Sequence, residues 1–356
     1  MPNRKIVLTG GGTAGHVMPN LALIPGLKKE GFDIAYIYAR NGMEKEIVEA
    51  SGLRSYGISA GKLRRYLSIE NLKDPFKIMK GYFEARKILK EEKPDLVFSK
   101  GGFVTVPVVY AARSLKIPVV LHESDYTPGL ANKLSIPNAN KICVSFEAAM
   151  QHLPKEKTVL TGSPVREEIF SGNKERAKDF TGLKAEKPVL LVTGGSQGAL
   201  DVNRAVDAAI DELLASFEII HLRGAGKLNP ELDGREGYVQ YEFISKELPD
   251  LFALSDLVLS RAGANTIFEF LALNLPSLLV PLPLEASRGD QILNAEYFRE
   301  KGFAMVLPQN EITKERLVSD IKKLHENAAE MKKNMKNSVM SDGTKAVLEV
   351  IMGEIK

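Results

Sequence analysis

The 356-residue sequence contains a single cysteine, Cys143. One cysteine excludes an intramolecular disulfide and a cysteine-rich zinc site, and it is typical of a reducing compartment. No apolar run is long enough to span a bilayer, because the longest, residues 268–284, is broken by Glu269, Asn274 and three prolines. The N-terminus lacks the pattern of a signal peptide. These absences predict a cytosolic protein without a transmembrane helix.

The sequence also lacks the common motifs of metal and phosphoryl-transfer chemistry. There is no Asp-x-Asp, the five histidines form no His-x-x-x-His pair, and no Gly-x-x-x-x-Gly-Lys-[Ser/Thr] occurs. We therefore expect no catalytic metal and no cofactor. If the chain were an enzyme that uses a nucleotide sugar, helix N-termini and cationic or hydroxyl side chains would have to stabilise the leaving diphosphate. Arg166, Ser196 and Arg261 are candidates for this role.

The net charge of +3 hides a difference between the two halves. Residues 1–163 hold 24 Lys and Arg against 15 Asp and Glu, whereas residues 164–356 hold 24 against 30. Such a difference indicates that the halves meet different partners. An anionic membrane or a nucleic acid would suit the basic half. Nucleic-acid binding is disfavoured, because we find no recognition motif and no interleaved aromatic residues.

Short, largely apolar strands alternate with helical stretches along the whole chain. This pattern predicts an α/β fold with doubly wound parallel sheets. The expected strands are Lys5–Thr9, Ile34–Tyr38, Leu96–Ser99, Val119–His122, Lys141–Val144, Thr158–Thr161, Val189–Thr193, Glu218–Leu222, Val239–Phe243, Leu257–Ser260, Ser277–Pro281 and Ala304–Leu307.

The two halves open alike, each with a strand, a glycine loop and a helix. We therefore expect two Rossmann-like domains facing each other across a cleft, with residues 1–163 in the first and 164–342 in the second. The helix expected at about residues 343–356 is a candidate to pack back on the first domain.

Glycine loops follow several of the predicted strands, at residues 10–15, 101–102, 194–198 and 261–266. Bare backbone N–H groups before a helix N-terminus favour phosphate, so these loops favour a phosphate-bearing ligand in a shared cleft. Gly10-x-Gly12-x-x-Gly15 formally matches the dinucleotide fingerprint. The second strand, however, ends in Tyr38-Ala39-Arg40 without the expected carboxylate, which weakens an NAD-dependent oxidoreductase as an alternative.

The basic half contains an amphipathic segment. Residues 62–93 carry 10 Lys and Arg against 5 Asp and Glu, and Asp74 and Pro75 are predicted as the N-cap and first residue of a helix. Two apolar faces follow. The first comprises Ile78, Tyr82, Ala85 and Leu89; the second comprises Phe76, Met79 and Phe83, flanked by Lys77, Lys80 and Lys87. The second face is expected to meet the bilayer, with complete burial of the helix as the alternative.

Several of these motifs occur together in a known order and spacing. The chain resembles the MurG family of N-acetylglucosaminyltransferases of bacterial peptidoglycan synthesis over nearly its whole length. The motifs are Gly11-Gly12-Thr13-Ala14-Gly15-His16, Gly101-Gly102-Phe103, His122-Glu123, Pro128-Gly129-Leu130-Ala131-Asn132-Lys133, Pro164-Val165-Arg166, Gly194-Gly195-Ser196-Gln197-Gly198-Ala199, Arg261-Ala262-Gly263-Ala264 and Asp290-Gln291.

The resemblance implies the GT-B fold and the family's reaction. N-acetylglucosamine is transferred from UDP-N-acetylglucosamine to lipid I with inversion and without a required metal, which gives lipid II. It implies a peripheral protein on the cytoplasmic face of the cell membrane. The substrate-binding residues it implies are Thr13, Ala14 and Gly15 in the first half, and Arg166, Ser196, Ile244, Ala264, Asn265, Thr266, Glu269 and Gln291 in the second.

The general base has three candidates. The resemblance implies His16, and histidine is the side chain whose ordinary pKa lies near neutrality. His122 and Asp125 are alternatives. Many family members read His-Glu-Gln-Asn where this chain has His122-Glu123-Ser124-Asp125, so Asp125 could move a proton or only hydrogen-bond the sugar. Rival functions are another UDP-sugar enzyme, such as a diacylglycerol glycosyltransferase or a UDP-N-acetylglucosamine 2-epimerase, and a non-catalytic nucleotide-sugar-binding module.

Overall fold

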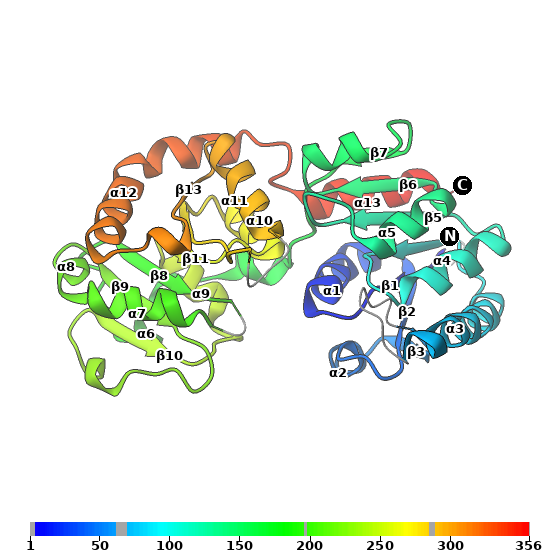
Figure 1. Cartoon of the computed structure of the whole chain (residues 1–356), viewed down its shortest axis with the longest axis horizontal. Coiled ribbons are helices and arrows are strands. Elements are labelled where there is room, and N and C mark those ends of the chain that lie inside the picture. The colour runs from blue at the N-terminus through cyan, green and yellow to red at the C-terminus, as the bar shows by residue number, and fades with distance from the viewer. Residues whose placement is uncertain (1–3, 62–69, 196–197, 285–288, 356) are drawn as a thin grey trace. The chain divides into compact units, whose positions relative to one another are not determined.

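The computed structural model describes residues 4–61, 70–195, 198–284 and 289–355. The chain forms two compact units (Figure 1). Unit 1 comprises Met1–Arg166 and Asp342–Lys356, and unit 2 comprises Glu167–Ser341. Each unit contains one fully parallel sheet flanked by helices, so the predicted fold class of two doubly wound α/β domains is confirmed.

Unit 1 is built on a seven-stranded sheet of order β3-β2-β1-β4-β5-β6-β7. Neighbouring strands are parallel throughout, as in the pairing of Ile6 with Ile34 and of Ile6 with Leu96. The strands are β1 (Arg4–Thr9), β2 (Phe32–Ala39), β3 (Arg54–Ile58), β4 (Leu96–Ser99), β5 (Val119–Glu123), β6 (Lys141–Val144) and β7 (Thr158–Leu160).

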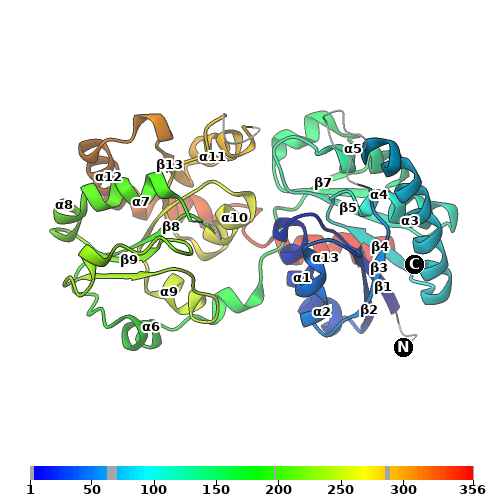
Figure 2. The same ribbon diagram turned by 60° about the horizontal axis from the view of Figure 1, so that its bottom comes forward.

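Helices cover both faces of this sheet, because alternate residues of each strand point to opposite sides. Ile6 and Leu8 pack with α1 (Ala14–Lys29), α2 (Glu44–Ala50) and α13 (Gly343–Glu354). Val7 packs on the opposite side with α3 (Glu70–Glu92) and α4 (Thr105–Ser114), which lie side by side (Figure 2). Shorter helices are α5 (Leu130–Ser135), η1 (Ile136–Asn138) and η2 (Glu147–His152).

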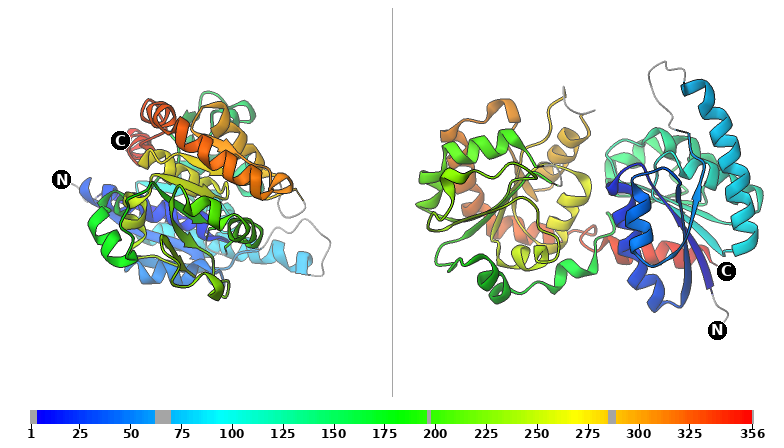
Figure 3. Two further views of the ribbon diagram at one scale, coloured as in Figure 1. Left: turned by 90° about the vertical axis from the view of Figure 1, so that its left-hand side faces the viewer. Right: turned by 90° about the horizontal axis from the view of Figure 1, so that it is seen from below.

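Unit 2 has a six-stranded parallel sheet of order β10-β9-β8-β11-β12-β13. The strands are β8 (Val189–Thr193), β9 (Glu218–Leu222), β10 (Tyr238–Tyr241), β11 (Leu257–Ser260), β12 (Ser277–Leu279) and β13 (Ala304–Val306). One face packs against α7 (Leu200–Ala208), α8 (Ile210–Leu214) and the long α12 (Lys314–Lys336), drawn in orange in Figure 3. The other helices are η3 (Glu167–Ser171), α6 (Lys174–Thr181), η4 (Pro230–Leu232), α9 (Leu248–Leu254), α10 (Ala264–Leu273), α11 (Asp290–Glu300) and η5 (Gln309–Glu311).

All twelve predicted strands are present, with ends that differ by at most two residues. One strand, β3, was not predicted. In each sheet the strand order reverses once, between β1 and β4 and between β8 and β11. Ligands of doubly wound folds bind beyond the carboxyl ends of the strands at such a reversal, so the loops there are the first place to look for a site.

Candidate active site

A cavity in unit 2 lies at the carboxyl ends of β8, β9 and β10, beside α10. Its volume is about 150 Å³. The lining includes three of the residues predicted to bind the nucleotide sugar: Ile244, Thr266 and Glu269. The full lining is Thr193, Gly195, Leu222, Glu242, Phe243, Ile244, Leu248, Phe252, Thr266 and Glu269.

The helix α10 supplies Glu269, one of the two acidic residues that line this cavity. Thr266 and Glu269 are three positions apart, so their side chains share one side of the helix. The helix begins at Ala264, so Ala264 and Asn265, which are also predicted to bind the substrate, lie in its first turn. A carboxylate accepts hydrogen bonds from two hydroxyl groups, and the N–H groups of a first turn attract an anion. Such a wall suits a ribose linked to phosphate.

A glycine loop forms another part of the cavity, directly after β8. Gly195 and Gly198 have φ angles of 75° and 68°, in the left-handed region that favours glycine. The Gly195 N–H donates a hydrogen bond to Thr193 Oγ1 at 3.3 Å. Ser196, predicted to contact the diphosphate, lies with Gln197 outside the described residues.

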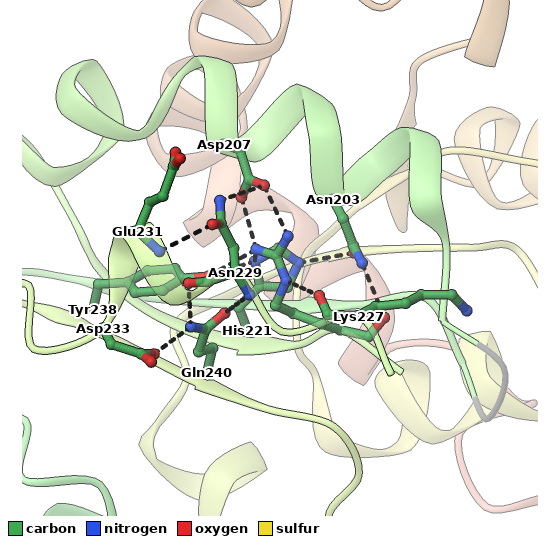
Figure 4. A network of polar contacts seen from close by, with 10 residues as sticks. Asn203, Asp207, His221, Lys227, Asn229, Glu231, Asp233, Tyr238 and Gln240 are labelled. Atoms are coloured by element: carbon green, nitrogen blue, oxygen red, sulfur yellow. Dashed lines mark hydrogen bonds and ion pairs between the residues drawn. The ribbon is translucent and has the colours of Figure 1, made fainter. Parts of the chain in front are cut away.

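A buried network of polar side chains fixes the segment beneath this loop (Figure 4). Arg223 is 4% exposed and donates to both carboxylate oxygens of Asp207, at 2.7 and 2.8 Å. Asn203 Nδ2 donates to the Arg223 carbonyl at 2.9 Å, and Asn203 Oδ1 accepts from His221 Nε2 at 3.0 Å. Gly198 packs on that same carbonyl so closely that a Cβ would not fit. The network therefore sets where the glycine loop can lie.

The charge states of this network are settled by burial and by Arg223. Burial and the nearby guanidinium lower the pKa of His221 to about 3, so the ring is neutral. Burial alone would raise the pKa of Asp207, but the hydrogen bonds and charge of Arg223 lower it. Asp207 and Arg223 therefore form an ion pair within the network.

Other predicted residues lie apart from the cavity or already have protein partners. Arg261 is 8% exposed and donates to the carbonyls of Val280 and Pro281, at 3.1 and 3.4 Å, which is a structural role. Gln291, in the first turn of α11, accepts from the Leu282 N–H at 3.1 Å through Oε1. Arg166 lies at the end of unit 1 rather than in unit 2.

In unit 1 the glycine loops after β1 and β4 contact each other. The Gly11 N–H donates to the Gly101 carbonyl at 3.3 Å, and a Cβ on Gly102 would collide with the Gly11 carbonyl. These are the loops between which the strand order reverses. Backbone contacts therefore hold the two loops together at the reversal of the strand order, where a Rossmann fold binds its ligand.

The buried side chain of Glu44 fills the anion position of the first loop. Its Oε2 accepts from the Gly12 N–H at 3.1 Å, and its Oε1 accepts from the Ala39 N–H at 3.1 Å. A carboxylate of the protein thus occupies the backbone donor that a pyrophosphate would use. This arrangement argues against the NAD-dependent alternative. Sequence reasoning did not single out Glu44.

His16, the first candidate for the base, is partly exposed in the first turn of α1, where Gly15 also lies, and Thr13 is the exposed N-cap residue of that helix. Its Nδ1 lies 2.9 Å from the Gly11 carbonyl and 3.1 Å from Thr13 Oγ1. Because a carbonyl only accepts, Nδ1 carries the proton of the neutral ring and Nε2 keeps its lone pair. Desolvation, and then the charge of Lys100, lower the pKa of His16 to about 4. The ring is therefore neutral at pH 7. Ala14 is the first residue of the same helix.

His122, one of the alternative bases, is fully buried and has no nitrogen available for a substrate. Its Nε2 donates to the Gly162 carbonyl at 2.9 Å, and its Nδ1 accepts from the ammonium group of Lys100 at 2.7 Å. Burial and the charge of Lys100 lower the pKa of His122 well below its usual value. This geometry argues against His122 as the base. Asp125 lies partly exposed in the loop after β5.

The helix α3 presents an apolar face to solvent. Phe76, Met79 and Phe83 are 79, 59 and 60% exposed, whereas Ala85 and Leu89 are buried. The alternative of a wholly buried helix is therefore wrong. Lysines flank the exposed face: Lys77, Lys80 and Lys87. A groove of about 530 Å³ adjoins it between α3 and α4, lined by Pro75, Ile78, Met79, Tyr82, Val106, Pro107, Tyr110 and Leu134.

The predicted start of this helix is also wrong. Asp74 and Pro75 lie inside α3, which already includes Glu70, so neither is an N-cap or a first residue. Asp74 is 5% exposed and pairs with Lys77 Nζ at 3.4 Å. A local Asp-Pro signal was overridden by the continuation of the helix toward the N-terminus.

In the described parts of the chain, no helix is long and apolar enough to cross a membrane. Nor, within the same ranges, does any group of three or more His, Cys, Asp or Glu side chains have the arrangement of a metal site.

Comparison with known proteins places these features in a family. The glycosyltransferase family 28 N-terminal domain matches residues 6–144, and the C-terminal domain of the same family matches residues 189–349. Proteins of Lachnoclostridium phytofermentans and Clostridium tetani are 53% and 51% identical to this chain. The alignments cover 98% of this chain and 98% and 97% of those proteins. Both proteins are named UDP-N-acetylglucosamine–N-acetylmuramyl-(pentapeptide) pyrophosphoryl-undecaprenol N-acetylglucosamine transferase.

A solved structure agrees with these relatives. The crystal structure of MurG from Acinetobacter baumannii has a TM-score of 0.76 at 26% identity, and the match covers 98% of this chain and 99% of that one. The chain belongs to glycosyltransferase family 28, and it is an enzyme of that class. Within the family, the resemblance to the MurG transferases that was drawn from the sequence motifs is confirmed.

Proposed function

We propose that this protein transfers N-acetylglucosamine from UDP-N-acetylglucosamine to the 4-hydroxyl of the N-acetylmuramyl-pentapeptide of lipid I. The products are lipid II and UDP, and the reaction belongs to peptidoglycan synthesis. The observation that carries this proposal is the 53% identity over 98% of the chain to a relative named for that transfer. The cavity beside Glu269 supports it, because its chemistry suits a nucleotide.

The donor is held by residues of unit 2 and by Arg166, the last residue of the first segment of unit 1, in this proposal. Glu269 accepts hydrogen bonds from the ribose hydroxyls, and the backbone at Ile244 contacts the uracil. The loop with Ser196 and the first turn of α10, at Ala264, Asn265 and Thr266, face the diphosphate. Arg166 and Gln291 complete the site at the diphosphate and the sugar. These roles rest on the family motifs and on the shared lining of Ile244, Thr266 and Glu269.

The acceptor is activated by unit 1. The 4-hydroxyl oxygen attacks the anomeric carbon and forms the new C–O bond, while the bond from that carbon to the diphosphate breaks and UDP leaves with its electron pair. His16 Nε2 takes the hydroxyl proton and passes it to solvent. A ring with a pKa of about 4 is neutral at pH 7 and so is ready to accept a proton. Anionic substrates stabilise the imidazolium and raise that pKa when they bind.

The protein works as a peripheral protein on the cytoplasmic face of the membrane, without a nucleic-acid partner. The exposed rings of Phe76 and Phe83 enter the headgroup layer, and the neighbouring lysines meet anionic lipids. A substrate anchored in the bilayer by its undecaprenyl chain requires the active site to come close to the surface.

A turnover assay tests the reaction. Radiolabelled UDP-N-acetylglucosamine and a lipid I analogue are incubated with the protein, and labelled lipid II is expected. Release of N-acetylmannosamine without lipid II would assign the chain to the epimerases. Donor binding without any product would leave only a binding module.

A further inference from the structure

Lys100 is a buried lysine directly after β4. It is 1% exposed, and its backbone N–H donates to the Thr9 carbonyl at 2.9 Å. A lysine is almost never fully buried unless its charge is paired. The lysine therefore calls for an explanation that the donor site, which lies in unit 2, does not provide.

The ammonium group of Lys100 joins two segments at the carboxyl edge of the sheet. It donates to His122 Nδ1 at 2.7 Å and to the hydroxyl group of Ser124. His122 is free to accept because its Nε2 carries the proton that bonds the Gly162 carbonyl. The charged end of the side chain thus lies beneath the loop that follows β5.

That loop is held from its other side by Glu123. Glu123 Oε1 accepts from the Asp125 N–H at 3.0 Å, and Oε2 accepts from the Gly129 N–H at 2.9 Å and from Asn132 Nδ2 at 2.8 Å. Residues 123–125 are therefore fixed by a carboxylate and by an ammonium group together. The motif departs from the common His-Glu-Gln-Asn at Ser124, which bonds Lys100, and at Asp125, which adds a charge.

Several titratable groups surround Lys100. Burial lowers the pKa of Lys100 to about 8, although the charges of Glu123, Asp125 and Cys143 oppose the shift. The charge of Lys100, in addition to burial, lowers the pKa of His16 on α1 and of His122 on β5. At pH 7 the ammonium group is therefore charged, and it acts on both candidates for the base, His16 and Asp125.

We propose that Lys100 is a positioning residue for the transfer: it fixes the loop that carries Asp125 through Ser124 and His122, and it is the counter-charge of the carboxylates there. The inference rests on the proposed function, because it needs a reaction to measure. The charge of Lys100 adds to the desolvation that lowers the pKa of His16.

Two substitutions separate position from charge. Lys100→Gln removes the charge but retains an N–H donor, whereas Lys100→Met removes both. Lys155, which is exposed, supplies the matched control Lys155→Met. The readouts are the pH profile of kcat/KM, kcat and the donor KM in the lipid I assay, and UDP binding with the thermal transition as folding controls.

Both Lys100 variants are expected to move the acidic limb of the profile to higher pH, by up to about one unit, because either base then binds its proton more tightly. Lys100→Met is expected to lower kcat further, by on the order of 10²-fold, since the loop also loses its anchor. The donor KM is expected to change less than about threefold. Ser124→Ala is expected to lower kcat without moving the acidic limb of the pH profile, because the charge of Lys100 remains.

If the acidic limb of the kcat/KM profile does not move in folded Lys100→Gln, the proposed role of Lys100 as a counter-charge is overturned. Full activity of Ser124→Ala together with loss of the thermal transition in both Lys100 variants would make Lys100 a residue of the fold alone. These results differ from a failure of the proposed function, in which the wild-type protein itself forms no lipid II.

Discussion

The carboxylate of Glu44 accepts a hydrogen bond from the backbone N–H of Gly12 at 3.1 Å, although 32 positions separate the two residues. The same carboxylate accepts from the Ala39 N–H. Glu44→Ala leaves both buried donors without a partner, which costs roughly 1–3 kcal/mol for each. We expect a lower denaturant midpoint for unit 1. Glu46, exposed on the same helix, gives the control Glu46→Ala, which should unfold like the wild type. An equal loss in both variants would mean that the missing acid in the first turn of the helix, and not the loop, explains the effect.

Removal of the His16 ring tests the base. His16→Ala is expected to lower kcat on the order of 10²-fold or more, with little change in UDP affinity, as for loss of a general base. Isothermal titration with UDP and initial rates with a lipid I analogue measure the two effects. Near-normal turnover of His16→Ala, combined with a collapse in Asp125→Ala, would move the base to Asp125.

The acid dependence of the wild-type enzyme follows from the pKa of His16. The neutral ring is the active form, and its pKa of about 4 lies below the usual 6.5. The free enzyme therefore loses its base only as the pH falls toward 4, and kcat/KM should stay near its maximum down to about pH 5. Rates at constant ionic strength, with circular dichroism at each pH to follow folding, check this. A limb near pH 6.5 would show that the ring is not desolvated.

Glu269 is expected to act on donor binding more than on the chemical step. A ribose contact binds the ground and transition states about equally, so Glu269→Ala raises the donor KM and changes kcat less. One lost charge-assisted hydrogen bond of roughly 1.5–3 kcal/mol corresponds to an increase of the donor KM by about 10- to 150-fold. If the wild type uses a 2′-deoxyribose donor as well as the natural one, the carboxylate has another role.

The exposed face of α3 is expected to bind anionic vesicles. Replacement of Phe76 and Phe83 by serine should weaken sedimentation with such vesicles and leave UDP affinity and the thermal transition unchanged, because both rings are exposed. Each flanking cation contributes about 1 kcal/mol near an anionic surface, so binding should also fall at high salt. Phe170→Ser, at an aromatic residue 56% exposed in unit 2, is the control. Equal vesicle binding by the double variant and the wild type would contradict the proposal that this face of α3 binds the membrane.

Turnover is expected to persist in EDTA. The sequence has no Asp-x-Asp, and the glycine loops with their helix N-termini offer the diphosphate an alternative to a metal ion. The measurement compares rates with EDTA and with added Mg²⁺ or Mn²⁺. Loss of activity in EDTA that a divalent ion restores would refute this account of the leaving group.

The parallel sheets could be predicted because their buried strands are short apolar runs between turn signals. The edge strand β3 could not, since Arg54-Ser-Tyr-Gly-Ile is half exposed and has no such run. In the same way, the apolar spacing on α3 predicted both faces, whereas a local Asp-Pro pair gave a wrong start for the helix.

The contacts that organise the site were beyond sequence reasoning. Lys100 and Glu44 look like surface residues in a sequence, because charged side chains are usually exposed. Their partners lie far along the chain: Lys100 bonds His122 and Ser124, and Glu44 bonds Gly12. Only the assembled sheet brings them together. The family motifs, by contrast, located Ile244, Thr266 and Glu269, whose common cavity is a feature of the folded unit.

The return of α13 to unit 1 determines the order in which the chain can complete its fold. Val347 and Ile351 are buried in the core beside α1 and β1, and Thr344 Oγ1 exchanges hydrogen bonds with the backbone of Val165 at 2.8 and 2.9 Å. Unit 2 is one continuous segment and can fold as soon as it has been synthesised. Unit 1 begins first on the ribosome yet keeps an uncovered apolar face until its final helix emerges. The half of the protein that carries His16 and the exposed apolar face of α3 is therefore the last to be finished.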